Sequence, residues 1–286
     1  MSTGDVPLVS IITPAYNSAR YLPDLLRSVS GQSYARIEHV IIDDGSDDDG
    51  ATVRLLERQP GVRWWSRRNV GQYATMNEGV RAATGEFVTL ISADDFYVDG
   101  DAVGALARCL IDHPECDVAY GFTLHVNDAG QPLPVQPYQR YPPWMLRYSP
   151  GFIFHCSLLV RRTALLRDDC LFDESVRFVG DAEWMIRLSK RYRFLRIDRC
   201  IGAYRHHDDQ TSSQAARDER ADARRRNEHT WLHQRHGTGH VMKALVGTYN
   251  TFHQRRVKAL TAWRRGGSRQ VLTLASGWIE RKYGRK

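Results

Sequence analysis

Two adjacent carboxylates, Asp94 and Asp95, follow directly after the apolar run at residues 87–91. Neighbouring carboxylates repel each other, which raises the pKa of one of them unless a cation lies beside them. Magnesium and manganese ions prefer carboxylate oxygens and usually share their coordination sphere with substrate phosphates. The alternative, that both residues cap a helix over residues 101–110, places them too early for its first turn. The pair therefore predicts a divalent-cation site that phosphates complete.

The loop "TPAYN", residues 13–17, offers groups for a nucleotide base. The ring of Tyr16 can pack on a base and the amide of Asn17 can hydrogen-bond to it, while Pro14 stiffens the strand exit. The alternative is a tight turn in which Asn17 or Ser18 caps the following helix. The loop lacks the G-x-G-x-x-G cluster of dinucleotide-binding folds, which argues against an oxidoreductase.

The loop "DDGSDD", residues 43–48, is the second acidic loop. Asp43 and Asp44 stand at the tip of the preceding strand, where a carboxylate can accept a hydrogen bond from a base imide or a ribose hydroxyl. Asp47 and Asp48 have a simpler explanation, because acids in the first turn of a helix complement its dipole.

Short strands alternate with helical patterns in the first half of the chain, which predicts a largely parallel sheet covered on both faces. Ligands of such sheets bind beyond the carboxyl ends of the strands, so the loops 13–18, 43–47 and 92–95 should converge on one crevice. The predicted strands cover residues 8–12, 37–42, 62–66 and 87–91, and the predicted helices about 22–29, 52–58 and 74–83.

The pattern changes in the second half. Residues 131–143 contain five prolines and predict a loop over the sheet, since proline fits neither a helix interior nor a central strand. Strands are predicted at 118–126, 152–160, 194–197 and 201–206, a helix at 181–192, and helical structure beyond residue 214.

Four polar residues of the second half remain open to two interpretations. Arg205, His206 and His207 end the last predicted strand and could reach a diphosphate or a metal, or could pack as ordinary side chains. His155 lies within an apolar run, where it faces the acceptor side or is a hydrogen-bonded structural histidine.

The charge of the chain is concentrated at its end. The net charge is +7, yet residues 254–286 hold ten basic residues and one acid, so the remainder is close to neutral. Apolar residues at 271, 274, 275 and 278 share one helical face, which predicts either a helix on an anionic membrane or a helix packed on the domain with solvated charges.

The cysteines and the apolar segments indicate the compartment. The five cysteines show no C-x-x-C pair and no zinc-type spacing, so reduced, mostly buried thiols are expected. No apolar run approaches the roughly 18 residues of a membrane span, and residues 1–7 lack a signal-peptide core. We therefore expect a cytoplasmic protein.

Five segments together resemble glycosyltransferase family 2: "VSIITPAYN", "VIIDDGSDD", "NVGQYATMNEGVRAATGEFVTLISADD", "FVGDAEWMIRLSKRYRF" and "AYRHH". They occur in the order and spacing of that family over about residues 7–210. The resemblance implies an α/β fold of GT-A type, with a mostly parallel central sheet, flanking helices and a Rossmann-like nucleotide-binding half. The expected domain covers residues 1–213, divided into a nucleotide-binding half (7–126) and an acceptor half (127–213), and a basic helical extension covers 214–286.

The resemblance also implies the reaction. It predicts inverting transfer of a sugar from a nucleoside diphosphate sugar, with UDP-sugar as the expected donor and Mn²⁺ or Mg²⁺ as the cofactor. The acceptor would be a hydroxyl of a saccharide or lipid-linked saccharide, in bacterial surface polysaccharide or glycoconjugate synthesis. No nucleic acid is expected, and residues 254–286 could bring the protein to the cytoplasmic face of the inner membrane.

Matched position by position, the resemblance suggests roles for individual residues. Asp181 falls where the family has its catalytic base, and Asp44 where it has a carboxylate that contacts the base of the nucleotide. Asp95 is the favoured metal ligand, with Asp94 and His207 as further ligands. The residues assigned to the nucleotide sugar are Pro14, Ala15, Tyr16, Asn17, Asp43, Asp44, Asn69, Gly71, Asn77 and Asp94.

Three positions depart from the family pattern. Ser92 stands where many members have the first acid of D-x-D, Met76 where many have an arginine, and Gly180 where an acid often precedes the base. Weaker metal binding or an altered donor preference would follow from these changes.

Three other classes are less consistent with the residues. A glycoside hydrolase needs carboxylates separated by roughly 5 Å or more across a sugar, usually from different strands. A metal-dependent nucleotidyltransferase should show a basic or glycine-rich phosphate loop in place of "TPAYNS". A nucleic-acid-binding protein would use the basic tail but leaves the acidic crevice unexplained.

Overall fold

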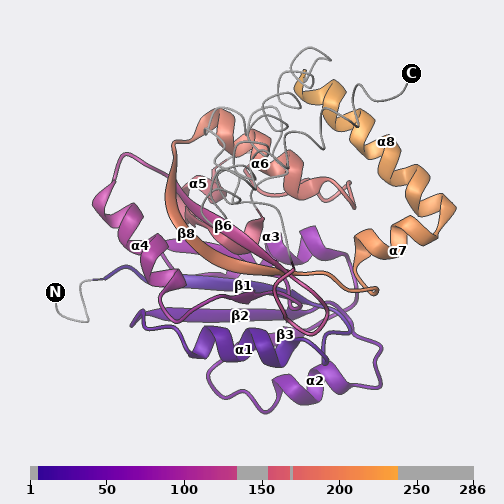
Figure 1. Cartoon of the computed structure of the whole chain (residues 1–286), viewed down its shortest axis with the longest axis horizontal. Helices are drawn as coiled ribbons and strands as arrows, with labels where there is room; N and C mark the ends of the chain where they lie inside the picture. Colours follow the sequence, from indigo (N-terminus) through magenta and orange to yellow (C-terminus); the bar gives the residue numbers. More distant parts are fainter. Residues whose placement is uncertain (1–5, 134–153, 168–169, 238–286) are drawn as a thin grey trace, which may run out of the picture. The chain divides into compact units, whose positions relative to one another are not determined.

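An eight-stranded sheet forms the centre of the structure, with the strand order β3-β2-β1-β4-β7-β6-β8-β5 (Figure 1). The computed structural model describes residues 6–133, 154–167 and 170–237. The strands are β1 (Val9–Ala15), β2 (Ile37–Asp43), β3 (Arg63–Ser66), β4 (Phe87–Leu90), β5 (Phe96–Tyr97), β6 (Val118–Val126), β7 (Leu158–Arg161) and β8 (Phe194–Arg205).

The sheet is parallel in its first half and mixed in its second. Strands β3, β2, β1 and β4 pair in parallel, as the alternating pattern predicts. Strand β7 is antiparallel to both β4 and β6, while β8 is parallel to β6 and antiparallel to β5. The two strands predicted at 194–197 and 201–206 form one strand, β8, which is irregular in register opposite Phe122. The short strand β5 is not among the predicted strands, because two residues carry no periodic signal.

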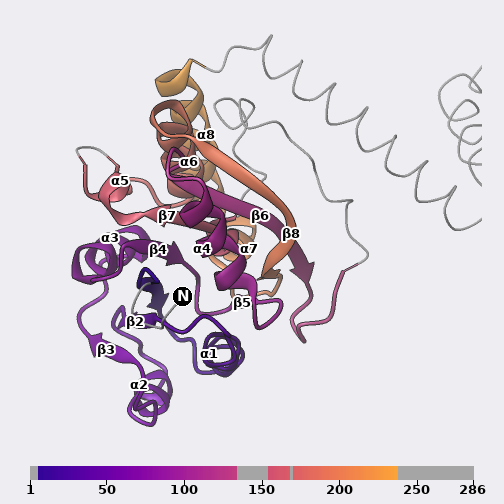
Figure 2. The same cartoon turned by 90° about the vertical axis from the view of Figure 1, so that its left-hand side faces the viewer.

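Helices cover both faces of the sheet and create two apolar cores (Figure 2). One core contains residues of α1, α2 and α4, and the other contains residues of α3, α5, α6 and α8. The helices are α1 (Leu22–Ser30), α2 (Ala51–Leu56), α3 (Gln72–Ala82), α4 (Ala102–Asp112), α5 (Arg162–Leu166), α6 (Gly180–Arg191), α7 (Thr211–Arg217) and α8 (Glu219–His236), with a short 3₁₀ turn, η2 (His155–Ser157).

Strand β4 contributes side chains to both apolar cores. Successive side chains of a strand point to opposite faces, so Phe87 enters the core under α4 while Val88 enters the core under α3. The continuous apolar run before Asp94 is therefore a strand buried on both faces. Its end places the 92–95 loop at the carboxyl edge of the sheet, beside the ends of β1 and β2.

The last described helix, α8, packs on the domain. Leu232 is buried in the second core, and the carboxylate of Glu228 accepts hydrogen bonds from the backbone N–H groups of Arg177 and Phe178 at 2.7–3.0 Å. The compact unit continues to Gly237, beyond the predicted boundary at residue 213. The predicted tail at 254–286 and most of the proline-rich loop lie outside the described residues. None of the described helices has the length and apolar character needed to cross a membrane.

Candidate active site

The first two loops of the predicted crevice are tied together by Asn17 and Asp47. The Asn17 amide donates to the Asp47 carboxylate at 2.5 Å, and the Asp47 backbone N–H donates to the Asn17 side-chain oxygen at 2.8 Å. Asn17 has a φ of 49°, which asparagine tolerates better than most residues. Its side chain therefore joins two loops and does not cap α1. The Tyr16 ring, which is 47% exposed, remains free to pack on a planar ligand.

Asp43 supports the second loop from inside. Its side chain is completely buried, and it accepts hydrogen bonds from the hydroxyls of Ser46 and Ser66. These bonds fix the turn that follows β2. In this structure Asp43 thus holds the loop together from within, and its predicted contact with a nucleotide stays a prediction.

Asp44 is also nearly buried, but it holds a different turn. Its carboxylate pairs with Arg67 and accepts the backbone N–H groups of Val70 and Gly71, each at 2.9 Å. Gly71 has a φ of 98° and directly precedes α3, so the carboxylate organises the start of that helix. A carboxylate has about four lone-pair positions, and three donors leave roughly one for a ligand.

Arg67 is a site residue that the sequence pattern does not reveal. Its guanidinium lies between the carboxylates of Asp44 and Glu78 and also donates to the hydroxyl of Thr75 at 2.9 Å. The two carboxylates raise its pKa, although burial acts in the opposite direction. A buried acid at a strand end signals that a cation must be near, but the sequence does not say which arginine folds back onto it.

The structure separates Asn69, Gly71 and Asn77, three of the residues predicted to bind the nucleotide sugar. Asn69 is exposed next to Gly71, at the rim of the crevice. Asn77 is buried, and its amide bonds to both the N–H and the C=O of Phe172 at 2.9–3.0 Å and to Glu174 at 2.8 Å. These bonds tie α3 to the segment before α6, and the predicted donor contact of Asn77 stays a prediction.

Asp94, Asp95 and His207 come together at the end of β4 and β8. The His207 Nε2 lies 2.9 Å from the Asp94 carboxylate. Asp95 is 1% exposed and accepts the Arg205 backbone N–H at 3.0 Å through one oxygen. Its other oxygen, Oδ2, has no hydrogen-bond partner among the described residues, nor does the Nδ1 of His207. Burial, followed by the charge of Asp94, raises the pKa of Asp95 well above its usual range.

Arg205 does not reach into the site, contrary to one of the two interpretations above. Its guanidinium is 2% exposed, lies between the rings of Tyr21 and Phe96, and donates to the backbone oxygens of Asp94 and Asp128 at 2.8 and 2.7 Å. It thereby connects the backbone of the 92–95 loop to the turn at 127–131, which contains Asp128.

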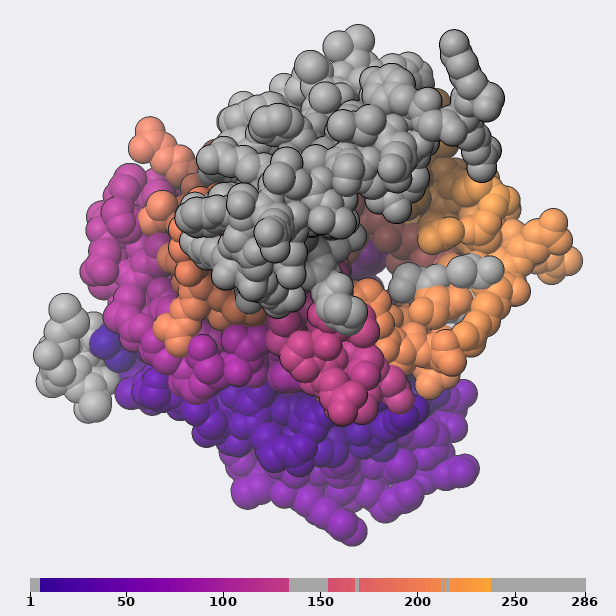
Figure 3. Space-filling model, in the orientation of Figure 1, coloured from indigo at the N-terminus to yellow at the C-terminus, as the bar shows by residue number. Residues whose placement is uncertain are grey.

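The turn at 127–131 lies on the surface next to the start of α1 (Figure 3).

His206 points in another direction from His207. Its exposed ring is bonded to that of His125 at 2.8 Å and stacks on it, next to Phe154 and Tyr204. Burial and the neighbouring His207 lower its pKa. Of Arg205, His206 and His207, only His207 bonds to the side chain of a predicted metal ligand, since the Arg205 guanidinium contacts the backbone oxygen of Asp94.

Asp181 lies in the first turn of α6, as the sequence predicts. It is partly exposed, and its backbone N–H donates to the hydroxyl of Tyr73 at 3.3 Å. The pKa of His155 is lowered by burial. The negative charges of Asp181 and Asp94 act on the same imidazole in the opposite direction. The imidazole of His155 bonds to the hydroxyl of Ser92 at 3.0 Å. The predicted catalytic base and the predicted metal ligand are therefore both close enough to His155 to perturb it.

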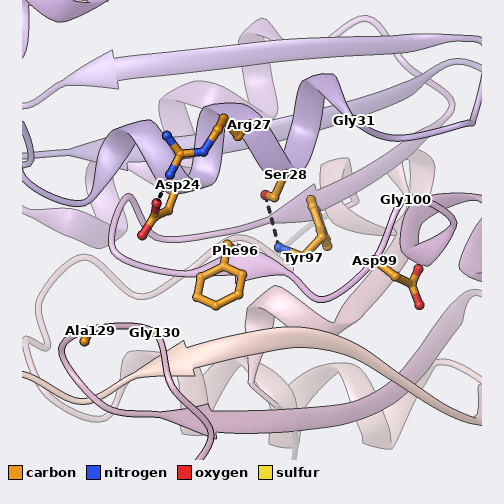
Figure 4. A pocket seen from close by; sticks show the side chains of 10 residues that line it. All are labelled: Asp24, Arg27, Ser28, Gly31, Phe96, Tyr97, Asp99, Gly100, Ala129 and Gly130. Atoms are coloured by element: carbon orange, nitrogen blue, oxygen red, sulfur yellow. Dashed lines mark hydrogen bonds and ion pairs between the residues drawn. The ribbon is translucent and has the colours of Figure 1, made fainter.

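A separate pocket of about 430 Å³ lies between α1, β5 and the turn at 127–131 (Figure 4). None of the residues predicted for the donor or the metal lines it. A hydrogen bond joins two of the elements that line the pocket: the backbone N–H of Tyr97 in β5 donates to the Ser28 hydroxyl in α1 at 3.1 Å. Its lining residues are Asp24, Arg27, Ser28, Gly31, Phe96, Tyr97, Asp99, Gly100, Ala129 and Gly130.

The sequence and the fold are similar to those of known glycosyltransferases. Residues 10–168 match Glycosyl transferase family 2. An uncharacterized glycosyltransferase of Rickettsia typhi is 29% identical over 224 residues, covering 73% of this chain and 67% of the relative. Residues 1–349 of S. aureus TarS in complex with UDP-GlcNAc align with a TM-score of 0.58 at 22% identity, over 71% of this chain and 60% of that TarS fragment. A Pyrobaculum calidifontis mannosyltransferase, PcManGT, in complex with GDP-Man and Mn²⁺, aligns with a TM-score of 0.54 at 19% identity, over 99% and 89% of the two chains.

The mixed sheet with its flanking helices is that of a GT-A glycosyltransferase domain. The family match covers more than half of the residues, so the chain belongs to glycosyl transferase family 2. The resemblance inferred from the five sequence segments is confirmed. The chain spans 67% of the Rickettsia relative, 60% of the TarS fragment and 38% of the longer TarS chain, so its donor, acceptor and biological role are proposals.

Proposed function

We propose that this chain transfers a sugar from a UDP-sugar to an acceptor hydroxyl with inversion, using Asp181 as the base. The observation that carries the proposal is the meeting of Asp94, Asp95 and His207 at the carboxyl edge of the sheet, with the buried Asp95 Oδ2 unpartnered. Buried polar atoms without protein partners are rare, and a bound ion or water often satisfies such an atom. The TarS structures with UDP and with UDP-GlcNAc support the choice of donor.

The donor set fits a hard divalent cation that is shared with a substrate. Within the described ranges, no three His, Cys, Asp or Glu side chains are arranged to hold a metal by themselves. Mg²⁺ and Mn²⁺ sites often use only one or two carboxylates and complete their shell with phosphates and water. Asp94 and Asp95 would hold such an ion together with phosphate and water oxygens, and His207, which contacts Asp94, is the further predicted ligand. The chemistry of the ion there would be Lewis-acid stabilisation of the charge on the leaving diphosphate. PcManGT was solved with Mn²⁺, which supports this choice of cofactor.

The nucleotide would lie across the loops after β1 and β2. Tyr16 offers an exposed ring for the base, and Asp44 retains roughly one acceptor position for a base or ribose donor. Asn17 and Asp43 act indirectly, because their polar atoms hold the loops together. The exposed Asn69 completes the rim on the side of α3.

Asp181 would remove the proton from the acceptor hydroxyl as that oxygen attacks the sugar carbon opposite the departing diphosphate. A positioned carboxylate of this kind typically contributes about 10²- to 10⁴-fold in rate. One carboxylate oxygen of Asp181 accepts the backbone N–H of Ala182 at 2.7 Å, which orients the side chain within the first turn of α6. The other oxygen is available to an acceptor.

Calorimetric titration of the full chain with UDP, GDP and ADP, each with and without MnCl₂, tests this proposal. We expect UDP to bind and Mn²⁺ to strengthen its binding. Binding of GDP or ADP in preference to UDP would contradict the proposed donor class. Absence of any nucleotide binding in the presence of Mn²⁺ would contradict the proposed function itself.

The acceptor is proposed to be a saccharide or lipid-linked saccharide of bacterial surface polysaccharide or glycoconjugate synthesis, at the cytoplasmic face of the inner membrane. The basic residues at 254–286 support a membrane contact, because each Lys or Arg near an anionic surface contributes about 1 kcal/mol. Co-sedimentation with anionic vesicles should be lost on deletion of 254–286. Equal sedimentation of the truncated and full chains would contradict the membrane contact.

A further inference from the structure

Three uncharged polar side chains meet where the two halves of the domain join. Gln72 is the first residue of α3, Ser92 follows β4, and His155 begins η2 in the second half. The Gln72 amide donates to the Ser92 hydroxyl at 3.4 Å, and the same hydroxyl is bonded to the His155 Nε2 at 3.0 Å. We call this the Gln72–Ser92–His155 cluster. Ser92 is one of the three positions that depart from the family pattern.

The cluster is a neighbour of the groups proposed for the two ends of the reaction. Ser92 precedes Asp94 by two residues, on the side of the diphosphate. His155 is within the electrostatic influence of both Asp94 and Asp181. The sugar carbon must lie between the leaving diphosphate and the attacking hydroxyl, so the transferred sugar would be placed beside this cluster.

The chemistry of the cluster matches hydroxyl groups and not ions. A carboxamide, a hydroxyl and a neutral imidazole each donate and accept hydrogen bonds, as sugar hydroxyls do. Burial favours the neutral form of His155, and its ring is only 9% exposed. The two buried or half-buried guanidinium groups near the site are already paired, Arg67 with Asp44 and Arg205 with Asp24, while Arg68 is exposed beside Asn69. An anionic sugar beside the cluster would therefore lie near the carboxylates of Asp94 and Asp181, with the charges of Arg67 and Arg205 already neutralised.

We propose that the Gln72–Ser92–His155 cluster reads the hydroxyl groups of the transferred sugar and selects an uncharged hexosyl or N-acetylhexosaminyl donor over a uronic acid donor. This inference rests on the proposed function, because it assumes that a nucleotide sugar occupies the crevice. It assigns these residues to donor specificity and not to proton transfer.

Binding measurements test the inference without knowledge of the acceptor. The wild-type chain and the variants Gln72→Ala, Ser92→Ala and His155→Gln are titrated calorimetrically with UDP, UDP-GlcNAc and UDP-glucuronate in the presence of MnCl₂. His113→Ala is the matched control, since its imidazole contacts Glu115 on the surface. Circular dichroism verifies folding. Gln72 is exposed, so Gln72→Ala is a variant that does not disturb the interior.

We expect the wild type to bind UDP-glucuronate about tenfold or more weakly than UDP-GlcNAc, because like charges across a binding site are costly. Ser92→Ala and His155→Gln should each weaken UDP-GlcNAc by about 2- to 10-fold and leave UDP unchanged, as expected for one neutral hydrogen bond. Equal wild-type affinity for both UDP-sugars, or variants that weaken UDP and UDP-GlcNAc alike, would overturn the inference. Failure of the wild type to bind UDP would overturn the proposed donor first, and this inference with it.

Discussion

The ring of Tyr73 occupies the space that a side chain at Gly180 would need. A Cβ atom at position 180 would lie 2.4 Å from the Tyr73 Cε2, closer than real Cβ contacts come. The Tyr73 ring is fixed in turn by stacking on Phe172 at 5.2 Å, and its hydroxyl accepts the N–H of Asp181. Gly180, where the family often has an acid, is therefore explained by the Tyr73 ring, which leaves no room for a side chain. Helix α3, which begins directly after Gly71, therefore supports the start of α6, the helix that carries the proposed base Asp181.

Gly180→Ala should destabilise the fold by about 1–3 kcal/mol, as overpacking of a filled site usually does. Without the ring, the same change would be neutral or favourable, since alanine is the better helix residue. The double variant Gly180→Ala with Tyr73→Ala should therefore be less destabilised than the sum of the single variants. Urea denaturation of the four proteins measures this coupling, and strictly additive free energies of unfolding would contradict the packing relationship.

Asp181→Asn tests the proposed base. Asparagine keeps the size of the side chain but cannot accept the proton, so turnover should fall by about 10²- to 10⁴-fold while UDP affinity stays within about twofold. Asp112→Asn, at an exposed position of α4, is the matched control. Release of UDP from UDP-GlcNAc, with the acceptor or with water, reports the turnover. Turnover equal to that of the wild type would remove Asp181 from the role.

The first half of the fold could be predicted from the sequence because its signals are local. Apolar runs mark β1, β2 and β4, and the polar loops that follow them must lie at one edge of a parallel sheet. This reasoning alone predicts that Asp94 lies beside groups that could share a metal. The same logic predicts a strand at 152–160, which overlaps β7, but it does not reveal that β7 pairs antiparallel with β4 and β6, because pairing partners far apart in sequence leave no periodic trace.

Residues whose contacts come from distant parts of the chain show more directly what the sequence does not reveal. Asn77 sits in a motif beside Gly71, yet its partner Phe172 is 95 residues away, and only that contact shows that the amide is buried. Arg67 and Tyr73 carry no pattern of their own. Their importance comes from Asp44 and Gly180, to which the fold brings them.

Asp95→Asn should separate metal binding from stability. Asp95 Oδ2 is buried without a partner in the described residues, so removing its charge should leave the unliganded protein as stable as the wild type or more stable. The rise in melting temperature produced by MnCl₂ with UDP should be lost. Thermal melts with and without Mn²⁺ and UDP measure both effects. If Mn²⁺ and UDP stabilised the Asp95→Asn variant as much as the wild type, Asp95 would be ruled out as a ligand.

The buried His39 should make the fold sensitive to acid. Its ring bonds to the Thr13 hydroxyl at 3.1 Å between β1 and β2, and burial lowers its pKa from 6.5 to about 3. Because the unfolded chain takes up the proton first, the stability that the neutral ring contributes is complete above pH 6.5. It is lost progressively as the pH falls from 6.5 toward 3, by up to a few kcal/mol.

His39→Gln keeps a hydrogen-bonding side chain but does not titrate. Between pH 6.5 and 5, the free energy of unfolding of the wild type should therefore fall relative to that of the variant, by about 1.4 kcal/mol for each pH unit well below 6.5. Urea denaturation at half-unit steps of pH measures the free energy of unfolding of both proteins. The difference between the two proteins removes the contribution of every titrating group that they share. The exposed His113→Gln serves as the control and should follow the wild type. Parallel curves for wild type and His39→Gln would show that His39 is not held neutral in the folded protein.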